Sequence, residues 1–236
     1  MRDSWRHFAA EFVGIFALVF VGGGAIMATT QAQTPNALLD VAVAHGLILA
    51  LMVTATMRIS GHLNPAVTIG FLAARRIEPM MAVVYIIAQL LGAALAAYAL
   101  KVIFPADIIA ATRLGGQSVA TDVSTFQAIF AEAIATFFLT FVVFGTAVDP
   151  KAPKVGGFAI GLVVTADILA IGPLTGASMN PARSFGPAVV SGVLEGQMIY
   201  WVGPIIGSVI AAVFYDQLFL RRVPEPVDHG AVRPGQ

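Results

Sequence analysis

Two stretches of this chain share a tripeptide: Gly61-His62-Leu63-Asn64-Pro65-Ala66-Val67 and Ala177-Ser178-Met179-Asn180-Pro181-Ala182-Arg183. Asparagine is a preferred helix N-cap and proline is favoured at the first helical position, so each Asn-Pro-Ala predicts the start of a helix. Both stretches lie within apolar sequence. A helix that starts inside a membrane places its positive dipole end there, where a polar group or a polar solute must interact with it. We therefore expect the two tripeptides to mark the functional site.

The composition is that of a membrane protein. Hydrophobic residues make up 58% of the 236 residues and charged residues 11%, whereas about a quarter of the residues in soluble domains are charged. We expect one all-α transmembrane domain over residues 1–236, with six spans, two re-entrant half-helices and a disordered tail at residues 223–236. The expected spans are Phe8–Met27, Ala37–Met57, Met80–Phe104, Phe126–Val148, Gly156–Ile171 and Met198–Leu220.

The distribution of charge predicts the orientation. Basic residues lie at both termini and in alternate loops, while the opposite loops hold only Lys101 and Arg113 together with four acidic residues. By the positive-inside rule both termini are cytoplasmic, and we expect the chain in the cell (inner or plasma) membrane. The absence of cysteine excludes disulfides and thiolate chemistry. The basic residues that carry this argument are Arg2, Arg6, Arg75, Arg76, Lys151, Lys154, Arg221 and Arg222.

The chain also repeats itself. The two asparagines are separated by 180 − 64 = 116 residues, and an Ala-Glu pair opens an apolar run both at Glu11 and at Glu132. Gly92 and Gly207 give nearly the same offset, 115 residues. Each half, at about residues 8–104 and 126–220, holds three spans, so the second half enters the membrane from the opposite side. The half-helices of this inverted repeat should meet near the midplane.

The chemistry at that meeting point is that of a selective pore. A capping asparagine accepts a backbone N–H with its oxygen, which leaves its NH₂ group as a donor. Asn64 and Asn180 could then both donate to one passing water, which could not at the same time accept a proton from its neighbour. Aspartate would cap equally well but attract cations. Arg183 is a cation at membrane depth, which predicts a functional role, although it could also tie down loop carbonyls.

Three carboxylates lie within the expected spans. Glu11 and Glu132 occupy equivalent places in the repeat, and we expect them to accept hydrogen bonds from the backbone of the re-entrant loops. A proton relay is the alternative role for this pair. Asp167 has no role that the sequence assigns.

The doubled Asn-Pro-Ala, the sequence Ala-Arg-Ser-Phe-Gly-Pro that begins at Ala182, and the repeat together resemble the aquaporin (major intrinsic protein) family over about residues 8–220. The resemblance implies a bundle of six tilted helices and two half-helices, assembled as a homotetramer with one pore per subunit. It also implies a selectivity filter, which falls on His45, Ile168, Ala177 and Arg183. The first loop is one residue shorter than is usual, so Ala44 and Gly46 are alternatives to His45.

These filter residues are most similar to those of the tonoplast (vacuolar) plant members, which pass water and often ammonia or urea. Ser184 stands where glycerol facilitators typically have aspartate. We therefore expect a passive channel for water and small neutral solutes, held in the lipid bilayer, that excludes ions and protons. A glycerol or small-polyol facilitator and, further off, an ion-coupled secondary transporter are the alternatives. We expect no enzymatic activity, no cofactor, no metal and no nucleic-acid partner, since no catalytic motif is present.

Overall fold

The computed structural model describes residues 4–153 and 155–220. Six helices in this part of the chain are long and apolar enough to cross a membrane, and the all-α fold class is confirmed. In the first half these are α1 (Ser4–Gln31), α2 (Ala37–Thr56) and α4 (Pro79–Ile103), and in the second half α6 (Thr125–Val143), α7 (Phe158–Thr175) and α9 (Ile199–Tyr215). The tail expected at residues 223–236 lies outside the described residues.

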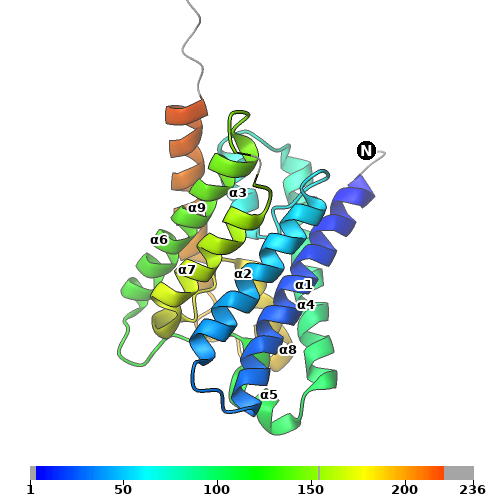
Figure 1. Cartoon of the computed structure of the whole chain (residues 1–236), viewed down its shortest axis with the longest axis vertical. Coiled ribbons are helices and arrows are strands. Elements are labelled where there is room, and N and C mark those ends of the chain that lie inside the picture. Colours follow the sequence, from blue (N-terminus) through cyan, green and yellow to red (C-terminus); the bar gives the residue numbers. More distant parts are fainter. Residues whose placement is uncertain (1–3, 154, 221–236) are drawn as a thin grey trace, which may run out of the picture.

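Two short helices, α3 (Pro65–Ala73) and α8 (Pro181–Ser191), begin directly after the two asparagines. Figure 1 places α3 toward the top of the bundle and α8 toward the bottom, so the two enter from opposite ends. Each half-helix packs against the last long helix of the other half, α3 on α9 and α8 on α4. The two halves therefore interlock.

The long helices differ from the expected spans in a few places. The fifth span runs on to Thr175, four residues beyond its expected end, because Pro173 does not stop the helix. Single π-helical turns, Phe144–Val148 and Asp216–Leu220, extend α6 and α9. A short helix that the sequence did not predict, α5 (Ala106–Thr112), and a 3₁₀ turn (Arg113–Gly115) lie in the connection between the halves.

Small residues bring the helix backbones together. A side chain at Gly92 of α4 would meet the carbonyl oxygen of Phe12 in α1, and one at Gly207 of α9 would meet that of Ala133 in α6. These glycines hold equivalent places in the two halves and allow the α1–α4 and α6–α9 pairs to pack closely.

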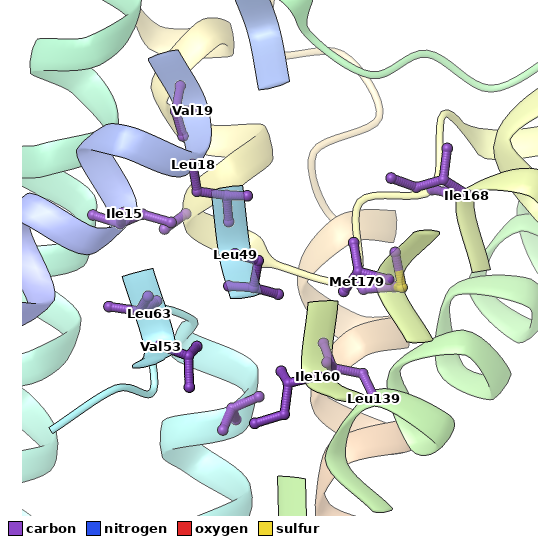
Figure 2. Packing of buried hydrophobic residues seen from close by; sticks show 14 of the residues in the cluster. Ile15, Leu18, Val19, Leu49, Val53, Leu63, Leu139, Ile160, Ile168 and Met179 are labelled. Atoms are coloured by element: carbon purple, nitrogen blue, oxygen red, sulfur yellow. The ribbon is translucent and has the colours of Figure 1, made fainter. Parts of the chain in front are cut away.

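The apolar core forms where the halves meet. Figure 2 shows Ile15, Leu18, Leu49 and Val53 of the first half gathered toward Leu139 of the second half. Large apolar side chains are also exposed along the outer faces of the long helices, as suits contact with lipid. Both ends of the described chain lie at the top of Figure 1.

Candidate functional site

Each re-entrant loop is held by one buried glutamate. Glu11 of α1 is fully buried; its Oε1 accepts from the backbone N–H groups of Gly61 and His62, both at 2.9 Å. Its Oε2 accepts from the N–H of Leu63 and from Nε2 of Gln89, both at 2.7 Å. The carboxylate thus satisfies three successive loop donors that no helix could satisfy.

Glu132 of α6 does the same for the second loop. Its Oε1 accepts from Oγ1 of Thr175 at 2.7 Å and from the N–H of Ser178 at 2.9 Å. Its Oε2 accepts from the N–H of Met179 at 2.7 Å. A proton relay would need carboxylate oxygens free to exchange protons with the pore, whereas those of both glutamates are engaged by the loops. The geometry is the one that a loop-support role requires.

These loops place the two asparagines as helix caps. Oδ1 of Asn64 accepts from the N–H of Ala66 at 2.9 Å, and Oδ1 of Asn180 accepts from the N–H groups of Ala182 at 3.1 Å and Arg183 at 3.3 Å. Proline occupies the first position of both helices. The positive ends of α3 and α8 therefore point toward each other, and Ala66 and Ala182 are fully buried between them.

The amide nitrogens join the two loops to each other. Nδ2 of Asn64 donates to the carbonyl oxygen of Met179, and Nδ2 of Asn180 donates to that of Leu63, both at 2.8 Å. Leu63 and Met179 turn their carbonyls toward the partner loop with φ of 48° and 53°. The sequence predicted that both NH₂ groups act as donors, and in the structure each commits one hydrogen to the opposite loop. One hydrogen of each amide remains for another acceptor.

A narrow cavity of about 30 Å³ runs past this junction. Both asparagines line it, together with Ser178 and apolar residues of both halves. Ile160 and Val164 of α7 form part of the apolar wall. At this size the cavity suits water-sized molecules, with a polar edge beside a smooth apolar surface.

All four residues expected to form the filter line the same cavity. Arg183 is 2% exposed, and its Nε donates to Nε2 of His45 at 3.1 Å. Nδ1 of His45 lies 2.8 Å from the carbonyl oxygen of Val41, so the ring proton belongs on Nδ1 and Nε2 is free to accept. Ile168 and Ala177 are also buried. Val67, the counterpart of Arg183 in the repeat, faces the same cavity, so the pore is chemically asymmetric.

Of the three candidates for this place in the filter, His45 lines the cavity, whereas Ala44 and Gly46 do not. His45 is in contact with Arg183, whereas a side chain at Gly46 would run into Thr165 and Gly161 of α7. His62 also borders the cavity, and the centroid of its ring lies 4.1 Å from that of Phe71.

Two features were not assigned from the sequence. Gln117, between the 3₁₀ turn and α6, contacts the guanidinium of Arg183; it lies outside both repeats, and nothing in its sequence context points to it. Asp167 is 7% exposed, and its Oδ2 has no hydrogen-bond partner among the described residues. The described residues also contain no group of three or more His, Cys, Asp or Glu side chains placed to hold a metal ion.

Comparison with known proteins identifies the family. A family model described as "Major intrinsic protein" matches residues 1–215. The chain belongs to the major intrinsic protein family. It is a multi-pass membrane protein, and the resemblance found in the sequence is confirmed. This family is one of channels rather than enzymes.

Named relatives of this major intrinsic protein are plant aquaporins. It is 42% identical to probable aquaporin TIP3-2 of Arabidopsis thaliana, an alignment that covers 98% of this chain and 90% of the relative. It is 43% identical to aquaporin TIP4-4 of Zea mays, with 91% and 87% covered. A solved structure of the aquaglyceroporin from Plasmodium falciparum matches with a TM-score of 0.80 and 26% identity, over 91% of this chain and 96% of that one.

Proposed function

We propose that this protein is a passive channel that conducts water and small neutral solutes such as ammonia or urea, and that excludes ions and protons. The observation that carries the proposal is the junction of the two loops. There, two asparagine amides from opposite halves and two positive helix ends border one narrow cavity. The aquaporin names of the relatives agree with this function.

The exclusion of ions follows from charge and hydrogen bonding. A cation near the asparagines meets the positive ends of α3 and α8 as well as Arg183, and the apolar wall offers nothing to replace its hydration shell. A water whose oxygen accepts from both amides orients its own hydrogens outward along the file. That orientation interrupts the chain of hydrogen bonds that a proton needs.

A glycerol facilitator is the second candidate, because a structural neighbour is an aquaglyceroporin. Two buried side chains in contact, His45 and Arg183, narrow the filter and favour water over a polyol. An ion-coupled transporter would need carboxylates free to bind a cation beside the cavity. Glu11 and Glu132 are both occupied by loop donors, and Asp167, whose Oδ2 has no partner among the described residues, does not line the cavity.

Location and assembly belong to the same proposal. The basic residues at the termini and in alternate loops support cytoplasmic termini. We place the protein in the plasma or inner membrane as part of the proposal. The apolar outer faces of the helices fit both lipid and neighbouring subunits, and a homotetramer with one pore in each subunit is the assembly we propose.

Stopped-flow light scattering on proteoliposomes tests this function. Wild-type protein should accelerate osmotic shrinkage with a low activation energy, and glycerol re-swelling should be much slower. Asn180→Asp, which introduces an anion at the junction, should allow a cation or proton leak. Asn36→Asp, the same change at an exposed position before α2, is the matched control. Water flux no faster than in empty liposomes would contradict the proposal.

A further inference from the structure

A second, wider cavity lies away from the pore. It is a crevice of about 520 Å³ between the C-terminal end of α3 and the π-helical turns that extend α6 and α9, at the top of the bundle in Figure 1. Its polar lining is Arg75, Arg76 and Asp216, and its apolar lining includes Phe71 and Val148. It shares no lining residue with the pore cavity. Because π-helical turns are rare and often found at functional sites, two of them at one crevice indicate a site of its own.

The crevice carries a net positive charge. Nε of Arg76 donates to Oδ1 of Asp216 at 2.6 Å, so this carboxylate balances one guanidinium. Arg75 is exposed, and among the described residues no acidic side chain pairs with it. Asp149, just after the π-helical turn of α6, accepts from the hydroxyl of Tyr215 at 3.3 Å and does not line the crevice. Two guanidiniums against one carboxylate therefore leave one positive charge for an anionic ligand.

An aromatic surface continues from the crevice onto α6 and α9. The ring centroid of Phe71, in the crevice wall, lies 4.8 Å from that of Phe144, which lies 6.1 Å from that of Tyr215. The ring of Phe219 follows, with its centroid 4.8 Å from that of Tyr215 and 5.9 Å from that of Phe141. Phe219 is 56% exposed, so the series of rings ends on the outside of the bundle. There it suits contact with acyl chains.

A phospholipid needs both features, a polar crevice for its headgroup and an apolar surface beside it for its chains. By the positive-inside rule, the end that holds Arg75 and Arg76 is cytoplasmic, and the cytoplasmic leaflet is the one rich in anionic lipids. A soluble phosphate would use the two arginines but would gain nothing from the aromatic rings. The combination of charge and rings therefore favours a lipid.

We propose that this crevice binds the headgroup of an anionic phospholipid, whose acyl chains lie along the aromatic surface of α6 and α9. The free charge of Arg75 attracts the lipid phosphate, and the terminal nitrogens of Arg76 add donors on the same wall. The inference rests on the proposed cytoplasmic orientation of the termini. It does not depend on which solute the pore conducts.

Native mass spectrometry of the full-length protein, purified in detergent and delipidated, measures the dissociation constant of the first bound lipid. The probes are dioleoylphosphatidylglycerol, dioleoylphosphatidylcholine, which has the same chains and a zwitterionic headgroup, and inorganic phosphate. Arg75→Gln removes the free charge, and Arg58→Gln is the same change at an exposed position outside the crevice. The unfolding temperature of each variant is measured alongside.

Phosphatidylglycerol should bind the wild-type protein more tightly than phosphatidylcholine. Arg75→Gln should weaken its binding about fivefold, the effect of one basic residue near an anionic surface, and Arg58→Gln should leave it unchanged. Asp216→Asn keeps an acceptor for Arg76 but removes the opposing charge, so it should strengthen the binding of phosphatidylglycerol. A merely structural role of the Arg76–Asp216 pair would instead weaken that binding and lower the unfolding temperature.

The aromatic surface has its own pair of variants. Phe219→Ala should weaken the binding of both lipids, whereas Phe126→Ala, which also removes an exposed ring but at the far end of α6, should weaken neither. Inorganic phosphate should not displace phosphatidylglycerol.

Equal affinities of the wild-type protein for the two lipids would overturn the inference. An equal loss in Arg75→Gln and Arg58→Gln would also overturn it, because the attraction would then come from the whole basic face. If phosphate displaced the lipid and Phe219→Ala bound normally, the crevice would be a site for a soluble anion. Failure of the wild-type protein to conduct water would refute the channel function and leave this inference standing.

Discussion

Replacing Glu132 by glutamine should detach part of the second re-entrant loop. Three donors converge on the two oxygens of this carboxylate, from Thr175, Ser178 and Met179. Glutamine supplies one oxygen and one NH₂ group. If the oxygen accepts from Thr175 and Ser178, the buried N–H of Met179 faces the NH₂ group, which is itself a donor. An orphaned N–H and two hydrogen bonds weakened by loss of charge together cost about 4 kcal/mol. In a chain of this size that corresponds to a fall of about 10 °C in unfolding temperature.

Thermal unfolding in detergent measures the loss of stability, and stopped-flow light scattering measures the water permeability. The carbonyl of Met179 accepts from Asn64, so a displaced loop should also lower the water permeability of each channel. Glu195→Gln, the same change at an exposed loop position, should leave both quantities at their wild-type values. If Glu132→Gln unfolds and conducts like wild type, the loop does not depend on this carboxylate and the reasoning fails.

Three further predictions concern packing and buried polar groups. Gly207→Ala should destabilise the protein by about 2 kcal/mol, because the added Cβ meets the backbone oxygen of Ala133. Gly24→Ala makes only ordinary contacts and should raise the unfolding temperature slightly. Equal unfolding temperatures of the two variants would contradict this. Tyr200→Phe removes the hydroxyl that donates to the carbonyl oxygen of Thr175, the last residue of α7, at 2.8 Å. This change should lower the free energy of unfolding by about 1–2 kcal/mol in a denaturation series. Asp167→Asn should keep the water permeability between about pH 5 and 8, because Asp167 does not line the cavity; a changed pH profile would show that it acts on the pore.

Local chemistry made the site recognisable in the sequence. Capping by Asn64 and Asn180 depends on residues at most three positions away, so the helix starts could be predicted from each tripeptide alone. The repeat supplied the pairing of Glu11 with Glu132, because equivalent places in two halves need equivalent loop support. Composition and hydropathy were enough for the six spans.

Contacts between distant parts of the chain could not be predicted in this way. The bond from Asn64 to the Met179 carbonyl depends on a left-handed backbone turn that the residue type does not indicate. Gln117 lies 183 − 117 = 66 residues from its partner Arg183, in a connection without periodicity or a repeat mate. The contact between His45 and Arg183 depends on the rotation of α2 relative to α8, which the sequence does not indicate.

The reciprocal bonds between the loops have a consequence for biosynthesis. When Asn64 leaves the ribosome, the carbonyl that accepts from its amide is not yet made, because Met179 follows 179 − 64 = 115 residues later. At roughly 5–20 residues per second, the first loop waits about ten seconds for its partner. During that interval the nascent first half holds a polar turn in the membrane without its counterpart, and translation of the second half completes it.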